Sequence, residues 1–228
     1  MSKISGGLNC INIMNGHTKA VATLFEYNGQ LYSGSTDCFV RAWDSLGNCT
    51  YESDLFTDSI AMTEHQGLLY CGSSDDSINI LISDQQRGQL RGHTDGVWAL
   101  TSYNGYLCSG SADETIRVWD SSGNQVIVLE DHIDGVRCLK EFCGYLYSGS
   151  RDKTIRVWDK NFICVAVING HDAAILCLEV YNGLIYSGSL DRTIKAFDPA
   201  GNCVKTLLGH TEGVVALQSL GNVENRYN

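Results

Sequence analysis

The 228-residue sequence has a single proline, Pro199, and no uninterrupted apolar segment of the ~18 residues that a membrane-spanning helix requires. Residues 1–10 also lack the apolar central region of a secretory signal peptide. These absences argue against a helical membrane protein and against a secreted one. We therefore expect an intracellular protein, in the cytoplasm or alternatively in the nucleus.

Basic residues are in deficit, because 16 Lys and Arg stand against 26 Asp and Glu and give a formal net charge of −10. Nonspecific binding to nucleic acid and binding to anionic lipid both depend on basic surface. We expect neither nucleic acid nor a membrane as a partner, although a local basic patch is compatible with an acidic whole.

The sequence has no Cys-x-x-Cys pair, so the ten cysteines do not predict a zinc site. Their positions indicate reduced, structural residues that fill one apolar strand position, as small buried hydrophobes do. One set recurs at equivalent places along the chain, and a second set does the same: Cys10, Cys49, Cys164 and Cys203, then Cys138 and Cys177. We expect no metal and no cofactor.

A repeat dominates what is present. Residues 106–120, 145–159 and 185–198 share the pattern Tyr-Ser-Gly-Ser-x-Asp-x-Thr-Ile with small changes, residues 31–44 are close to it, and residues 69–82 are a decayed copy. The period is 39 residues, as measured between successive histidines: His93, His132, His171 and His210. Self-similarity at a fixed period of this length indicates a repeat architecture.

Within one period, the segments 136–142, 145–150, 154–158 and 162–168 each read as a short strand rich in β-branched or aromatic residues. Four antiparallel strands joined by tight turns form one sheet, which cannot cover both of its apolar faces. Copies placed around an axis cover each other's faces. The sequence therefore predicts an all-β propeller made of four-stranded antiparallel blades.

The Gly-His, Ser-Gly-Ser-x-Asp and Trp-Asp elements at this period resemble the WD-repeat (WD40) family over residues 8 to about 220. The repeats are also similar to those of F-box/WD-repeat substrate receptors and of myosin heavy-chain kinases. Five complete units are expected, preceded by an outer strand over residues 8–15 and followed by a partial unit over 210–228. The complete units span residues 17–55, 56–92, 93–131, 132–170 and 171–209.

Five units and two partial ones leave the middle strands of a sixth blade unaccounted for. Three interpretations follow. The chain is a fragment of a six- or seven-bladed protein, or it closes with five blades, or a second chain completes the ring. A strand edge that stays uncovered can pair with another chain and cause aggregation.

Each well-preserved unit contains a His, a Ser and an Asp, the composition of a hydrolytic triad. An active site is needed once, whereas a structural device is needed in every blade, so the recurrence favours structure over catalysis. The resemblance implies a buried network that links these side chains to the Trp of the same unit. Its members would be His17, Ser33, Asp37, Trp43, His93, Ser109, Asp113, Trp119, His132, Ser148, Asp152, Trp158, His171, Ser187 and Asp191.

Two units depart from this set. In the fifth, Phe197 replaces the Trp, and in the second, the His, Ser and Trp positions hold Phe56, Cys71 and Leu81. We expect the second blade to be the loosest and to depend on apolar packing alone. His65 is the one histidine out of register with the repeat, and we expect it to be exposed at a turn.

The start of each first strand and the turn between the second and third strands are expected to meet on one rim of the propeller, which we call the top face. The first set of rim positions is Ala22, Ala61, Trp98, Arg137, Leu176 and Val215, and the second is Thr36, Ser74, Ala112, Arg151 and Leu190. Trp and Arg are over-represented in binding hot spots.

Trp98, Arg137 and Arg151 therefore stand out on the top face. The two arginines lie where F-box/WD-repeat receptors place arginines that bind phosphate, which implies an acidic or phosphorylated peptide as partner. The alternatives are that they pair with acids such as Asp134, and that Trp98 plugs the central channel.

The function that we expect is a non-catalytic scaffold or substrate-recognition module that binds a protein or peptide. The alternatives are a propeller fragment without a ligand of its own and an enzyme with a site in the central cavity.

Overall fold

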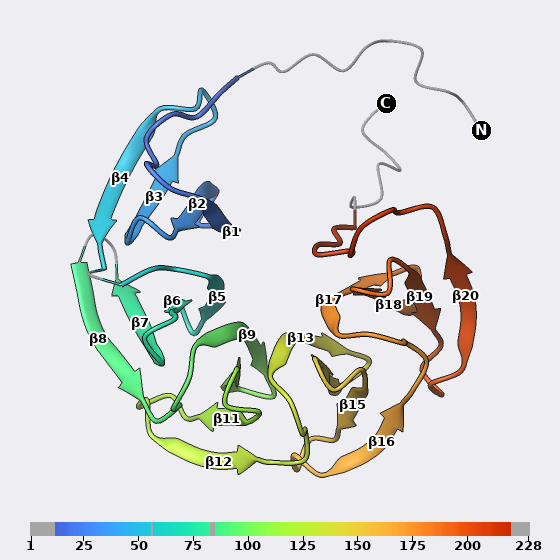
Figure 1. Ribbon diagram of the computed structural model, residues 1–228. Helices are drawn as coiled ribbons and strands as arrows, with labels where there is room; N and C mark the ends of the chain where they lie inside the picture. The colour runs from blue at the N-terminus through green and yellow to red at the C-terminus, as the bar shows by residue number, and fades with distance from the viewer. Residues whose placement is uncertain (1–11, 56, 83–84, 220–228) are drawn as a thin grey trace, which may run out of the picture.

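The computed structural model describes residues 12–55, 57–82 and 85–219, which form twenty strands in five separate antiparallel sheets. Figure 1 shows the sheets arranged around an axis as an open ring. We number these sheets as blades one to five in chain order, and within each blade the strands pair consecutively from the axis outward. In the described ranges, no helix has the length and apolarity needed to cross a membrane.

The strands of blades one to three are as follows: β1 (Val21–Tyr27), β2 (Gln30–Ser35), β3 (Phe39–Trp43) and β4 (Cys49–Asp54); β5 (Ala61–His65), β6 (Leu68–Gly72), β7 (Ser77–Ile82) and β8 (Gln85–Arg91); β9 (Val97–Tyr103), β10 (Tyr106–Ser111), β11 (Ile116–Trp119) and β12 (Gln125–Leu129). Those of blades four and five are β13 (Val136–Phe142), β14 (Tyr145–Ser150), β15 (Ile155–Trp158) and β16 (Cys164–Ile168); β17 (Ile175–Tyr181), β18 (Leu184–Ser189), β19 (Ile194–Phe197) and β20 (Cys203–Leu207). The predicted all-β propeller of four-stranded blades is confirmed.

Tight turns set the register of each blade. Between β9 and β10, Asn104 and Gly105 have positive φ angles of 51° and 81°, the conformation that a two-residue hairpin loop requires. Asn-Gly favours this conformation because both residues enter the left-handed region at little cost. Blade four has Cys143 (φ 51°) in the Asn position.

The hydrophobic core lies between blades rather than within them. Cys108, Ile116 and Leu129 of blade three form one buried cluster with Leu146 and Trp158 of blade four. Three further clusters join the remaining pairs of neighbouring blades in the same way. Each blade is therefore stabilised by the apolar surface that its neighbours cover.

The described cysteines are all free thiols. Cys49, Cys164 and Cys203 do share one position, at the start of an outer strand. The expectation that this position is buried is wrong, because Cys49 and Cys203 are exposed. The first residue of an outer strand lies on the periphery, where no neighbouring blade covers it. Cys10 lies outside the described residues.

The two ends of the ring do not meet (Figure 1). Residues 210–219 follow blade five and are in no strand, although the Val214 amide donates to the Ser189 carbonyl at 2.9 Å. The Val97 amide makes the same contact with Ser73 at 2.8 Å, so the segment lies where the inner strand of a next blade would begin. Of the outer strand expected over 8–15, residues 12–15 are in no strand and 8–11 lie outside the described residues.

The glycine of each Ser-Gly-Ser sequence permits the close approach of neighbouring blades. A Cβ atom on Gly149 would lie 2.6 Å from Cys138 Sγ and 2.7 Å from Ile175 Cγ2 of blade five. These separations are well below van der Waals contact, and Ile175 is buried in the interface. A side chain at this position would therefore force two blades apart.

Gly149→Ala is expected to lower the free energy of unfolding by about 1–3 kcal/mol, the usual cost of overpacking a core. Urea-induced unfolding measures it. Gly88→Ala is the matched control, because the added Cβ would lie 3.7 Å from its nearest neighbour, Ile80. Equal unfolding free energies for the two variants would contradict this account of the interface.

Candidate protein-binding surface

A buried chain of polar contacts runs through blade three. Trp119 Nε1 donates to Ser109 Oγ at 2.9 Å, and this hydroxyl lies 2.7 Å from His93 Nε2. On the other side of the ring, His93 Nδ1 lies 2.8 Å from the Asp113 carboxylate. Blade four repeats the three contacts at 2.9, 2.8 and 2.6 Å with Trp158, Ser148, His132 and Asp152.

The carboxylate at the end of this chain is tightly held. Burial opposes ionisation of Asp113, but hydrogen bonds from His93, Thr115 and the Thr94 amide outweigh it and keep the pKa of this carboxyl well below its usual range. The Ser109 hydroxyl is completely buried and accepts the Trp119 N–H. A hydroxyl so placed cannot reach a substrate, and its partners are those of a satisfied structural network.

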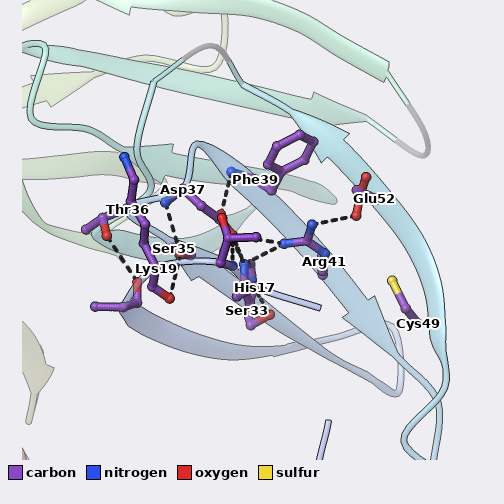
Figure 2. Close-up of polar contacts among 12 residues, drawn as sticks. His17, Lys19, Ser33, Ser35, Thr36, Asp37, Phe39, Arg41, Cys49 and Glu52 are labelled. Atoms are coloured by element: carbon purple, nitrogen blue, oxygen red, sulfur yellow. Dashed lines mark hydrogen bonds and ion pairs between the residues drawn. The ribbon is translucent and has the colours of Figure 1, made fainter. Parts of the chain in front are cut away.

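Blade one carries a variant of the network (Figure 2). Phe39 occupies the place of the Thr that supports the carboxylate in blades three to five, and Arg41 reaches in instead. Its Nη1 lies 3.3 Å from Asp37 Oδ2, and its Nη2 lies 2.6 Å from Glu52. Arg41 and Asp37 are both buried, so this ion pair lies inside blade one and takes the place of the Thr contact of blades three to five.

In blade five, His171 lies 2.7 Å both from Ser187 Oγ and from Asp191, so the network survives in part. Phe197 lacks the N–H that Trp158 donates to its serine in blade four. Phe197 is nevertheless 1 % exposed, at the same sheet position as Trp158. Apolar packing therefore holds Phe197 in place without the hydrogen bond that Trp158 makes.

Phe197→Trp is expected to raise the free energy of unfolding by about 1 kcal/mol, because it supplies the missing donor to Ser187. Trp158→Phe should lower it by roughly 1–2 kcal/mol through loss of the donor and of ring volume. Urea midpoints of the two variants check both signs. A Phe197→Trp variant no more stable than the parent would contradict this prediction.

The expectation that blade two depends on apolar packing alone is wrong, because this blade also contains polar contacts. Asp58 accepts hydrogen bonds from Ser73 Oγ at 2.9 Å and from Ser74 Oγ at 2.8 Å. Gln89 donates to Ser77 Oγ at 2.7 Å, so this blade has a polar network of its own. Cys71 and Leu81 are buried in an apolar cluster, as predicted, and Phe56 lies outside the described residues.

His65 is buried, with 2 % of its surface exposed, and the expectation of an exposed turn residue is wrong. It ends β5 in register with Tyr103 and Phe142, which end β9 and β13. Its Nδ1 lies 2.8 Å from Ser102 Oγ of the next blade, whereas Nε2 is buried without a partner. In blades one, three and four a buried or half-buried aromatic residue precedes the same x-Gly turn, and this pattern could have predicted that His65 is buried.

Burial lowers the pKa of His65, with Glu64 opposing the shift. As the pH falls below about 6.5, the unfolded chain binds a proton that the folded chain resists, so stability falls. His65→Phe, which copies Phe142, should lose less stability between pH 7.5 and pH 5.5 than the parent. The exposed His210 provides the control His210→Gln, which should keep the parent's pH dependence. Identical pH profiles for the parent and His65→Phe would contradict this.

The two sets of top-face residues do come together. The Arg151 amide donates to the Gly135 carbonyl at 2.9 Å, and the Ala112 amide makes the same bond to Gly96. One assignment shifts: Ala61 pairs with Gly72 as Ala99 pairs with Gly110, so Ile60 rather than Ala61 occupies the rim position in blade two. The Ser59 amide donates to the Ser35 carbonyl as the Val97 amide donates to Ser73, so the second unit is shorter before Ser59 rather than within its inner strand.

Trp98, Arg137 and Arg151 gather on the top face at blades three and four. The Arg137 guanidinium lies 4.2 Å from the centre of the Trp98 ring, a cation–π contact. The same ring lies against Gly135, so the indole packs across the boundary between β9 and β13. Trp98 and Arg137 are both half-buried, and Arg151 is exposed.

The two arginines differ in their partners. Arg151 Nε lies 3.6 Å from Asp134, and both side chains are about half exposed, so the predicted pairing with Asp134 holds for this arginine. Arg137 forms no ion pair within the described part of the chain, and its Nε is buried without a partner. Burial lowers the pKa of Arg137, and the neighbouring Arg151 charge adds to the effect.

An open ring of four-stranded blades, each braced by polar contacts between its strands, defines a β-propeller. The family model "WD domain, G-beta repeat" matches residues 8–44, 84–120, 123–159 and 162–198, and the chain belongs to this WD40 family. WD40 propellers generally serve as non-catalytic scaffolds for protein–protein interaction. In the described residues, no group of three His, Cys, Asp or Glu side chains is placed to hold a metal ion.

Among known proteins, the chain is 36 % identical over 75 residues to cell division control protein 4 of Candida albicans. That match covers 31 % of this chain and only 11 % of the relative. The WD40 propeller domain of Doa1 is 27 % identical, with a TM-score of 0.75 over 88 % of this chain and 72 % of that domain. The computationally designed protein Ika8 is 28 % identical, with a TM-score of 0.77 over 91 % of this chain and 67 % of the other.

Proposed function

We propose that this chain is a substrate-recognition or scaffold module whose top face, at blades three and four, binds an acidic or phosphorylated peptide. The observation that carries the proposal is the half-buried Arg137, stacked on Trp98 with no acidic side chain paired to it. A cation held in this way has unsatisfied donors and a fixed plane. Carboxylate and phosphate groups match that geometry through paired hydrogen bonds.

Trp98 supports the proposal by fixing the orientation of the guanidinium. Contact with the indole face and with the neighbouring blade removes rotamers that a free arginine would sample, so less entropy is lost when a ligand binds. The indole also offers apolar surface beside the cation. Hot spots of protein interfaces commonly combine these two side chains.

Arg151 would serve as a second donor. Its contact with Asp134 at 3.6 Å is between half-exposed side chains, and such surface pairs contribute little free energy. An anionic ligand can therefore replace Asp134 as partner at little cost. The corresponding positions of blade five hold Leu176 and Leu190, so the positive charge is confined to one place and fits one anionic group rather than a row of them.

The test is binding to an arrayed library of phosphoserine and phosphothreonine peptides, with the unphosphorylated library as comparison. The double variant Arg137→Ala plus Arg151→Ala should weaken the best binders about tenfold or more, since each charge-assisted contact contributes roughly 1.5–3 kcal/mol. Arg91→Ala is the matched control, because Arg91 is an exposed arginine on β8 of blade two. Unchanged affinity in the double variant, with its fold intact by circular dichroism, would refute the proposal.

A further inference from the structure

Phe162 closes the gap between blades three and four at the turn that leads into β16. It stands at a turn position where blades three and five have Gly123 and Gly201, with φ angles of 80° and 83°. Phe162 adopts φ 61° in the same left-handed region, which a residue with a side chain rarely enters. Its buried ring meets Tyr103 and Tyr106 edge-on, at centroid separations of 5.6 and 5.7 Å. The packing of one aromatic ring between two blades therefore outweighs an unfavourable backbone conformation.

Gly201 takes this place between blades four and five and supplies no side chain. The Gly201 amide donates to the Asp198 carbonyl as the Phe162 amide donates to Asp159, so the two turns correspond. A pocket of about 180 Å³ remains beside Gly201. Its lining includes Tyr145, Tyr147, Val165, Ala166 and Pro199. The pocket is thus the counterpart of the space that Phe162 fills one blade earlier.

The pocket is continuous with the buried interface of the two blades. Tyr147, Val157 and Ile168 line it and also belong to the apolar cluster that joins blades four and five. Tyr147 occupies the sheet position of the smaller Cys108, so it fills part of the space, and the pocket is what it leaves. An apolar group placed there would extend a core that the fold already buries.

The size of the pocket restricts what it can hold. An apolar cavity of about 150 Å³ accepts a benzene ring, so a pocket of about 180 Å³ accepts one aromatic ring. Pockets for whole small molecules are usually larger, at about 300–1,000 Å³. Tyr145 and Val165, which line the pocket, are 41 % and 53 % exposed. A single ring would leave this apolar rim in water, whereas a ring carried by a peptide would bring further atoms to cover it.

We propose that this pocket is a second binding site, which accepts one aromatic side chain of a partner protein in the way that the next blade boundary accepts Phe162. Tyr145 has the sheet position of Tyr106, so it would meet the incoming ring edge-on, as Tyr106 meets Phe162. Aromatic side chains anchored in pockets commonly dominate the affinity of protein interfaces. The site is separate from the top face, because Tyr145 begins β14 whereas Arg151 follows its last residue.

The experiment uses the full chain with isotope-labelled Val and Ile methyl groups, titrated by NMR. The probe is the acetylated, amidated peptide Gly-Ser-Phe-Ser-Gly, compared with the same peptide carrying Ala at its centre. The Phe peptide should shift the methyl signals of Val157, Val165 and Ile168. It should bind about tenfold more tightly than the Ala peptide or better, because only the phenyl ring is buried on binding.

Two variants test the site itself. Ala166→Trp should abolish binding of the Phe peptide, because the indole would fill the pocket, and Val165→Asp should weaken it about tenfold by placing a charge against the ring. Val126→Asp is the matched control. Val126 follows the first residue of β12 as Val165 follows that of β16, and it is 47 % exposed beside the space that Phe162 already fills. This variant should bind like the parent.

Equal affinity for the Phe and Ala peptides would overturn the proposal, as would binding that survives Ala166→Trp with the fold intact by circular dichroism. Binding of free toluene without binding of the Phe peptide would do the same, since the pocket would then serve a small molecule. A dimer in light scattering that Ala166→Trp disrupts would assign the pocket to a second copy instead. The double variant Arg137→Ala plus Arg151→Ala should leave binding of the Phe peptide unchanged, so this site and the top face are tested separately.

Discussion

The contact between neighbouring blades is the constraint on which the whole structure depends. A single four-stranded blade has two apolar faces and no core of its own, and the four clusters that form the hydrophobic core each join residues of two blades. The Ser-Gly-Ser sequence recurs because its glycine lets the second strand of one blade approach the first strand of the next. Repetition in the sequence thus reflects one interface used again and again.

Within each blade, the polar network fixes which strands pair and in what register. Its serines, histidines and aspartates have the composition of a hydrolytic site, but burial and hydrogen bonding commit them to structure. Binding to a partner therefore depends on side chains at the rim. Arg137 differs from the network residues in this respect, because its guanidinium is held in place by Trp98 while its charge has no acidic partner in the described chain.

The fold was predictable from the sequence because period, turn residues and apolar alternation all indicated the same architecture. Two of the errors, at Ala61 and His65, arose in the second unit, which differs in length from the others. The second unit is shorter before its inner strand, because Ser59 donates to Ser35 as Val97 donates to Ser73, and this places Ile60 rather than Ala61 in the rim position. His65 was misplaced because its polarity suggested solvent, whereas its register with Tyr103 decides its burial. The stacking of Arg137 on Trp98 depends on contacts across a blade boundary, which spacing within a unit does not reveal.

The cores between blades also determine what holds the rim in place. Each of the four clusters joins one pair of neighbouring blades. The stability of such a repeat structure is close to a sum of contributions from single repeats and from contacts between nearest neighbours. Blades three and four each take part in two of these clusters and share one of them. The contact between Trp98 and Arg137 crosses the boundary that this shared cluster closes, so a change that loosened the buried core there would separate the indole from the guanidinium at the surface.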